Sequence, residues 1–104
     1  MPTHKRGEVW LADLGIAAKI RPALILSVPP DPQDRVLVTL VPHTTSLHGT
    51  RFEVAVPKKF LSPGAFDAQG LVTVAAARLM RKLGDLQVNE LAQIEEAVRR
   101  WLSL

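Results

Sequence analysis

The segment LGDLQVNELAQIEEAVRRWL, residues 83–102, decides the fold because it carries the clearest helical pattern in the sequence. Its apolar stripe, spaced for one helical face, consists of Leu91, Ile94, Val98, Trp101 and Leu102. Two acidic residues each precede a basic residue by four positions, in the favourable order, as Glu95–Arg99 and Glu96–Arg100. The pattern predicts an amphipathic helix over about residues 88–103, ~24 Å long, whose stripe packs against the rest of the chain. Trp101 is therefore expected in the core or in an interface.

The residues before this helix favour short strands separated by turns. Apolar runs and alternations predict strands at 8–14, 23–28, 36–41, 52–56 and 65–74. VPPDPQDR, residues 28–35, has three prolines and two aspartates and is typical of a rigid turn. Residues 75–80 are ambiguous, since their alanines favour helix while their position after a strand favours a short turn or a strand extension. These elements indicate a mainly β, α+β fold, or a small barrel with a helix laid on it.

Length and composition predict one soluble domain. The chain has 104 residues, 47% hydrophobic and 22% charged, and no stretch approaches the ~20 apolar residues of a membrane span. The N-terminus lacks the apolar core of a signal peptide, so we expect a cytoplasmic protein without a membrane anchor. With no cysteine and three scattered histidines, the sequence supports neither a metal site nor a disulfide.

The positive charge is concentrated before the helix. Residues 1–84 carry 11 Lys/Arg against 6 Asp/Glu, giving +5, whereas residues 85–104 carry 2 against 4, giving −2. A polyanion such as nucleic acid could use this surplus, although a merely solubilising surface explains it equally well.

Two features could carry chemistry. Arg21 precedes Pro22, which forces it into an extended conformation at a strand entrance, and its planar fork suits phosphate. Pro42 is expected to end the preceding strand or lie at an edge. After it come His43, a possible acid or base, and the hydroxyls of Thr44, Thr45 and Ser46, which could equally cap their own loop. Trp10 could stack on a base but is more typical of a core.

Four segments resemble, in order, the MazF/PemK (Kid) family of toxin endoribonucleases. They are RGEVWLADL at 6–14, RPALILS at 21–27, VPHTTSLHGTRFEV at 41–54 and the tail at 83–102, which together span essentially the whole chain. The resemblance implies a single toxin domain over 1–104, with a small SH3-like β-barrel, a C-terminal helix at about 88–103, and homodimerisation. It also implies cleavage of single-stranded RNA, mRNA included, by 2′-hydroxyl attack at short sequences, without metal or cofactor. A cognate antitoxin would neutralise the toxin, and operator DNA would be bound together with that antitoxin.

The resemblance also assigns site residues. Arg21 matches the catalytic arginine, which would stabilise the transition-state phosphate and serve in proton transfer, and Thr44 matches the threonine that holds the phosphate. Further substrate-binding candidates are Thr45, Ser46, Gln69, Lys19 and His43.

The chain departs from the family in two places. The loop LGIAAKIRP, residues 14–22, is short and lacks the histidine and glutamate common there. Ala68 occupies the usual acidic position, and Asp67 lies one residue away, so on a regular strand it would face the other side unless a bulge intervenes. The alternative is therefore a noncatalytic member that acts as a nucleic-acid- or antitoxin-binding module.

Overall fold

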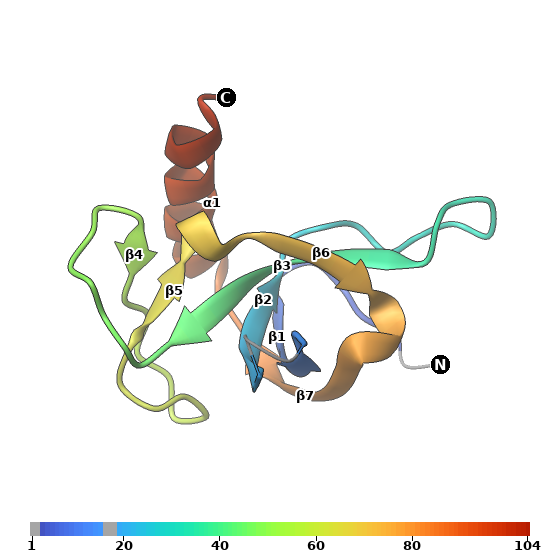
Figure 1. Ribbon diagram of the computed structural model, residues 1–104, viewed down its shortest axis with the longest axis horizontal. Helices are drawn as coiled ribbons and strands as arrows, with labels where there is room; N and C mark the ends of the chain where they lie inside the picture. The colour runs from blue at the N-terminus through green and yellow to red at the C-terminus, as the bar shows by residue number, and fades with distance from the viewer. Residues whose placement is uncertain (1–2, 16–18) are drawn as a thin grey trace.

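A computed structural model describes residues 3–15 and 19–104 as an antiparallel sheet with one C-terminal helix (Figure 1). The strands are β1 (Glu8–Asp13), β2 (Ile20–Ile25), β3 (Leu37–Thr44), β4 (Glu53–Val54), β5 (Ala65–Asp67), β6 (Val72–Ala75) and β7 (Leu79–Asp85). Two 3₁₀ turns, η1 (Ala68–Gly70) and η2 (Ala76–Arg78), flank β6, and α1 (Val88–Leu102) follows β7. The strand order is β4-β5-β3-β2-β1-β7, and β6 pairs with β3.

The long strand β3 joins the two parts of the molecule. On one side it pairs with β2, and on the other it pairs first with β6 through residues 37–40 and then with β5 through residues 43–44. In Figure 1, β4, β5 and α1 lie toward one end of β3, while β1, β2, β6 and β7 curl around its other part. Within the described residues no pairing joins β6 to β7, so the sheet is an open path. The predicted mainly β, α+β fold is confirmed in this form.

Both faces of the inner strands are buried. Neighbouring residues in a strand point to opposite faces, and β1, β2 and β3 each contribute residues to both of two apolar clusters. One cluster lies against the helix and includes Val9, Leu24, Val41, Phe66 and Ile94. The other includes Trp10, Ala23, Ile25, Val38, Leu40 and Leu79. Trp10, 5% exposed, is thus a core residue, and its Nε1–H donates to Glu8 Oε1 over 2.9 Å.

The helix matches its prediction to within a residue, but its last turn does not join the core. Ile94, Ala97 and Val98 are buried, whereas Trp101 remains 44% exposed and touches Phe52 edge-on at 5.4 Å between ring centroids. Of the two placements predicted for Trp101, the core is therefore wrong, and an interface stays a prediction. The ion pair Glu96–Arg100 forms at 3.2 Å, while Glu95 pairs with Arg6 instead of Arg99, because Arg6 reaches it from the loop before β1.

The predicted strand at 65–74 is confirmed in two pieces, β5 and β6, which η1 separates because the chain leaves the sheet at Asp67. Asp67 Oδ1 accepts the Gln69 N–H over 3.1 Å and caps η1, and the Ala68 N–H donates to the Phe52 carbonyl over 3.0 Å. Side-chain bonds of this kind compete with the strand ladder. The ambiguous segment 75–80 resolves into η2 and the start of β7, a strand that the sequence pattern did not predict beyond that point.

Two strand ends differ from prediction in a way that matters for the site. β2 begins at Ile20, so Arg21 lies within the strand and pairs with Ala12 of β1. β3 continues through Pro42 to Thr44. Pro42 is tolerated because it lies between the last residue paired with β6, Leu40, and the first paired with β5, His43, where the missing N–H interrupts no pairing on that side.

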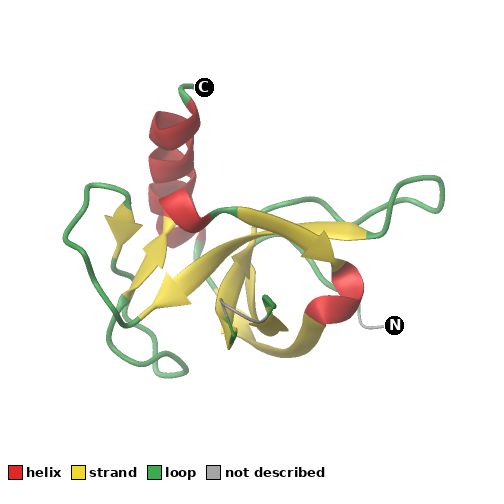
Figure 2. Cartoon of the chain, in the orientation of Figure 1, coloured by secondary structure: helices red, strands yellow, loops and turns green. Residues whose placement is uncertain are grey.

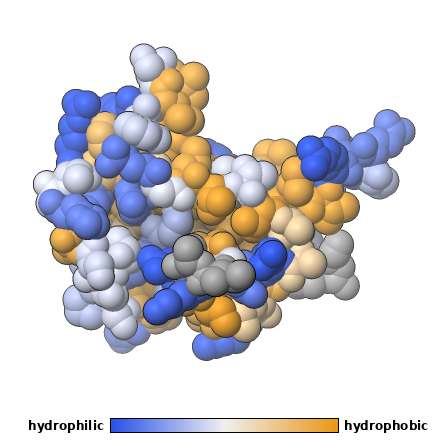
Figure 3. Space-filling view, in the orientation of Figure 1, coloured by the Kyte–Doolittle hydropathy of each residue, from blue (hydrophilic) through white to orange (hydrophobic). Residues whose placement is uncertain are grey.

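The predicted turn at 28–35 projects from the body as a long loop (Figure 2). The Asp34 N–H donates to the Asp31 carbonyl and the Asp31 N–H to Asp34 Oδ2, each over 2.9 Å. The tip of the loop is hydrophilic in the space-filling view (Figure 3). In the described part of the chain, no helix has the length and apolar character needed to cross a bilayer.

Candidate functional site

Arg21 of β2 and Thr44 of β3 line the same two cavities. The register of β2 and β3 pairs Ala23 with Pro42 and Leu24 with Val41. Continued by two residues toward the start of β2, the same register places Arg21 opposite Thr44. Strand pairing thus brings together a guanidinium and a hydroxyl that are 23 positions apart in the sequence.

Two cavities meet at this pair of residues. The first, here called the His43 cavity, has a volume of about 240 Å³ and is lined by Lys19, Ile20, Arg21, Pro22, His43, Thr44, Thr45, Ser46 and Ser62. The second, the His48 cavity, has a volume of about 390 Å³ and is lined by Leu14, Arg21, Pro42, Thr44, Ser46, His48, Asp67 and Gly70. Arg21, Thr44 and Ser46 belong to both walls, so they mark the junction.

A third hollow extends the groove. It measures about 330 Å³, shares His43 and Ser62 with the His43 cavity, and continues along Pro57, Lys58, Leu61 and Pro63. The Lys58 ammonium is held by Glu90 Oε1 of α1 at 2.7 Å. Because neighbouring hollows share lining residues, the three follow one another past the Arg21–Thr44 junction and form one groove.

The Thr44 hydroxyl does cap its own loop, as one interpretation of the sequence held. Thr44 Oγ1 accepts the Ser46 N–H over 3.0 Å. The same side chain nevertheless lines both cavities, as Ser46 does, while Thr45 lines the His43 cavity. The local bond fixes the hydroxyl at the junction, so capping and a role in the site are compatible.

His43 lies with its ring in the wall of the groove. It is 4% exposed and packs edge-on against Phe66 of β5, with 5.0 Å between ring centroids. Burial lowers the pKa of His43, because the surrounding apolar groups disfavour the charged imidazolium. The imidazole at this end of the groove is consequently neutral at pH 7.

A clamp built on Glu53 holds the loop that carries His48. The Glu53 carboxylate accepts the backbone N–H groups of His48 at 2.9 Å, Gly49 at 2.7 Å and Thr50 at 3.0 Å. The bond from the His48 N–H is the largest cause of the lowered pKa of Glu53. Nothing in the sequence pattern pointed to His48, which follows a hydroxyl cluster as part of an apparent turn. Its place in the cavity wall depends on a carboxylate five residues further along.

Of the other predicted site residues, some line the hollows and some do not. Lys19 lines the His43 cavity, but Gln69 is exposed on η1 and lines none of the three hollows. Ala68 is fully buried, and Asp67 lines the His48 cavity. A regular strand would turn Asp67 and Ala68 to opposite faces, which was the argument against Asp67 as a site residue. Because β5 ends at Asp67 and η1 follows, this alternation does not apply to Ala68. The middle of the short loop at 14–22, residues 16–18, lies outside the described residues.

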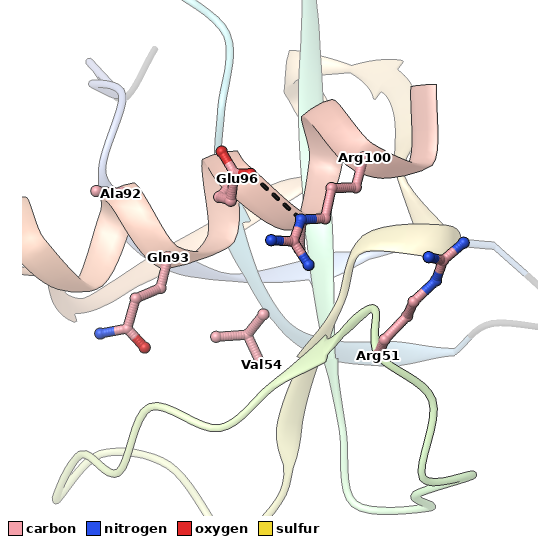
Figure 4. A pocket seen from close by; sticks show the side chains of 7 residues that line it. Arg51, Val54, Ala92, Gln93, Glu96 and Arg100 are labelled. Atoms are coloured by element: carbon pink, nitrogen blue, oxygen red, sulfur yellow. Dashed lines mark hydrogen bonds and ion pairs between the residues drawn. The ribbon is translucent and has the colours of Figure 1, made fainter. Parts of the chain in front are cut away.

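A separate hollow of about 480 Å³ lies between α1 and residues 51–54 (Figure 4). Its two guanidinium groups belong to Arg51, which lies 4.7 Å over the Phe52 ring, and Arg100, which is bonded to Glu96 at 3.2 Å. The remaining lining residues are Val54, Ala92, Gln93 and Ala97. The described lining residues of this hollow include no hydroxyl and no imidazole, in contrast to those of the two cavities at the Arg21–Thr44 junction.

The chain matches a model of one protein family. Residues 5–102 match the family described as PemK-like, MazF-like toxin of type II toxin-antitoxin system. The match covers both strands that carry the junction and the whole of α1.

Solved structures share the same fold over nearly the entire chain. An endoribonuclease in complex with its cognate antitoxin from a mycobacterial species is 25% identical, with a TM-score of 0.82 over 98% of this chain and 97% of that chain. The Mycobacterium tuberculosis toxin MazF-mt6 is 26% identical, with a TM-score of 0.79 over 93% and 97%. A MazE–MazF complex from Deinococcus radiodurans, 21% identical with a TM-score of 0.82 over 100% and 99%, supports the fold alone.

Proposed function

The chain belongs to the PemK-like, MazF-like toxins of type II toxin–antitoxin systems, and from this premise we propose that it is an endoribonuclease whose active site is the Arg21–Thr44 junction. The observation that carries the proposal is the β2–β3 register, which sets a guanidinium level with a fixed hydroxyl where two cavities meet. A single-stranded RNA could pass along the groove with one phosphate at the junction. Cleavage of mRNA in this way would inhibit growth.

The proposed reaction is attack of a ribose 2′-hydroxyl on the adjacent phosphorus. The transition state gathers negative charge on the non-bridging oxygens, and a guanidinium stabilises such charge through two parallel hydrogen bonds. Arg21 supplies this fork, and Thr44 and Ser46 orient the phosphate. These groups need neither a metal nor a cofactor, and we expect the walls formed by Lys19, Thr45 and His43 to contact the flanking nucleotides and select a short sequence.

The family also suggests the partners. We infer that a cognate antitoxin neutralises the toxin, that the toxin is a homodimer in the cytoplasm, and that operator DNA is bound together with the antitoxin. The curled sheet would act as the small SH3-like barrel of the family, since η2 leads from β6 directly into β7, and residues 1–104 would form one domain. Gln69, exposed beside the groove, would contact RNA outside the hollows.

The test is cleavage of a mixed single-stranded RNA pool by purified protein freed of antitoxin, with sequencing of both new ends. We expect cyclic phosphate and 5′-hydroxyl ends at a short common sequence. Arg21→Ala and Arg21→Lys should both lose cleavage, because a point charge does not replace the fork. Thr44→Ser should retain more cleavage than Thr44→Ala, with unfolding transitions unchanged throughout.

An intact RNA pool would refute the enzymatic proposal. The noncatalytic alternative would then predict RNA or DNA binding that weakens steeply with salt and is unaffected by Arg21→Ala. Lys59→Ala, an exposed charge outside the hollows, serves as the matched control for loss of a cation.

A further inference from the structure

The His48 cavity contains one group that the proposed reaction does not use, the carboxylate of Asp67. Phe66 of β5 packs edge-on against the His43 ring, and Asp67 follows Phe66 in the strand, so the Asp67 side chain points to the opposite face. Thr44 follows His43 in β3 and points to that opposite face as well. Asp67 and Thr44 therefore share one face of the sheet, in agreement with the cavity that both of them line.

The carboxylate lies at a suitable distance from the junction to contact a base. Thr44 pairs with Ala65, and Asp67 is two positions further along β5, which corresponds to about 7 Å along the strand. In single-stranded RNA a phosphate and the base of a flanking nucleotide are separated by a ribose, which spans a comparable distance. A phosphate bound at the Arg21–Thr44 junction would thus place a neighbouring base within reach of Asp67.

The walls around the carboxylate suit a flat ring. The cavity has a volume of about 390 Å³, and Leu14 and Pro42 give it apolar surface against which the face of a base can pack. At Gly70 an added Cβ would come within 3.3 Å of Asp67 Oδ2 and 3.5 Å of Pro42 Cγ. Glycine at this position therefore keeps the approach to Asp67 Oδ2 open.

The backbone fixes the carboxylate and leaves most of its hydrogen-bonding capacity unused. Asp67 Oδ1 accepts the Gln69 N–H over 3.1 Å, which holds the side chain at the start of η1. A carboxylate has about four lone-pair sites, and among the described residues no donor is bonded to Asp67 Oδ2. Both oxygens are consequently available as acceptors to a ligand in the cavity.

We propose that the His48 cavity binds a guanine next to the cleaved phosphate and that Asp67 selects this base, an inference that rests on the proposed endoribonuclease function. Proteins read single-stranded RNA through hydrogen bonds to the Watson–Crick edges of its bases. Guanine is the base whose edge carries two adjacent donors, N1–H and N2–H, which match the two oxygens of one carboxylate. Adenine and cytosine have a ring nitrogen acceptor beside the amino group, and uracil has a carbonyl on each side of N3–H. Each of these three bases would therefore set an acceptor against Asp67.

Inosine tests the contact directly, because it is guanosine without the 2-amino group. The cuts made by wild-type protein in a mixed single-stranded RNA pool are mapped first, and we expect a guanosine directly before or after the cut. A short RNA containing that site is then synthesised with guanosine, inosine or 7-deazaguanosine at this position. We expect inosine to lower kcat/KM by about 10-fold or more. The compound 7-deazaguanosine, which is altered away from the Watson–Crick edge, should be cleaved at the guanosine rate.

The variant Asp67→Asn tests the protein side of the same contact. The amide keeps one oxygen for the Gln69 N–H but replaces the other acceptor by a donor, so the preference for guanosine over inosine should be lost while the unfolding transition stays unchanged. Gly70→Ala, which crowds Asp67 Oδ2, should reduce the same preference. Asp31→Asn makes the matched change from carboxylate to amide at an exposed position of the projecting loop and should retain the wild-type preference.

The outcomes separate this inference from the function on which it rests. Cuts without a flanking guanosine, or equal cleavage of guanosine and inosine by the wild type, would overturn the guanine assignment. An Asp67→Asn variant that slows both substrates but keeps their ratio would also overturn it, because Asp67 would then support the groove without reading the base. Wild-type protein that leaves the whole RNA pool intact would instead refute the proposed endoribonuclease function.

Discussion

Gly64 packs directly against the backbone of Thr44. A Cβ added at Gly64 would overlap the Thr44 carbonyl oxygen and come within 2.9 Å of His43 Cε1. The φ of Gly64 lies outside the left-handed region, so its backbone conformation does not require glycine. The close approach of the Thr44 backbone does, because it leaves no room for a Cβ. The loop between β4 and β5 therefore sets the position of the end of β3, on which both the hydroxyl and the buried imidazole of the junction lie.

Replacing Gly64 by alanine should consequently damage both stability and the site. Overpacking a close contact typically costs about 1–3 kcal/mol, and the displaced strand end would carry Thr44 away from Arg21. We expect Gly64→Ala to lower the free energy of unfolding in urea by this amount and to reduce RNA cleavage in conditions where the protein is still folded. Lys59→Ala, in the same loop but exposed, should change neither quantity.

The clamp on the His48 loop gives a prediction that concerns activity rather than stability. Glu53→Ala removes the acceptor of three backbone N–H groups, so the loop loses the geometry that directs His48 toward the cavity. A shift of about 1 Å in the wall of an active site can cost roughly 100-fold in rate. We expect kcat to fall far more than the unfolding midpoint, with Glu96→Ala as the exposed acidic control. Unchanged kcat in Glu53→Ala would show that the three hydrogen bonds to Glu53 are not needed to hold the His48 loop in its active position.

Much of the fold follows from local pattern, and the misses have physical causes. The helix at 88–102 was predictable because its stripe and ion pairs are spaced by the helical period. The single strand predicted at 65–74 is divided into β5 and β6, because a hydrogen bond from the Gln69 N–H to Asp67 competes with strand pairing, and apolar alternation does not report such a bond. Pro42 was expected to end β3, but its tolerance depends on where β3 changes partner.

The site divides in the same way. Short motifs single out Arg21 and Thr44 as candidates, and both line the same two cavities, while their roles stay a prediction. His48 and Asp67 were not, since their positions depend on the Glu53 clamp and on the end of β5 at η1, which involve contacts between separate segments. Gln69 was assigned by motif alone and lies outside the hollows, because the 3₁₀ turn at 68–70 directs it to solvent.

His43 makes stability depend on pH. Burial lowers its pKa in the folded state, so the unfolded chain binds the proton at higher pH than the folded chain does. The free energy of unfolding should therefore fall as pH drops below about 6.5, the ordinary value for histidine, by at most about 1.4 kcal/mol per pH unit. The difference between wild type and His43→Phe, measured in urea from pH 5 to 8, isolates this contribution. Leu47→Ala, which alters an exposed side chain without a titratable group, should retain the wild-type slope.

Glu90 links the groove to the start of α1 and supports the last prediction. Its Oε1 receives both the Lys58 ammonium and the Gln87 N–H, each over 2.7 Å, and the two side chains of the ion pair are 18% exposed. Glu90→Ala removes the cap and the ion pair together, and loss of a helix cap typically costs about 1 kcal/mol. Glu90→Gln keeps an oxygen for the Gln87 N–H but loses the charge that holds Lys58.

Unfolding in urea and RNA affinity together should separate these effects. We expect Glu90→Ala to be less stable than Glu90→Gln, while both variants release Lys58 from α1 and so change RNA binding more than Glu96→Ala does. The pair Glu96–Arg100, with side chains 56% and 61% exposed, is the matched control, because exposed ion pairs contribute at most about 1 kcal/mol. Equal stability of Glu90→Ala and Glu90→Gln would show that the cap contributes little, and the beginning of α1 would then depend on packing of Leu91 and Ile94 against the sheet.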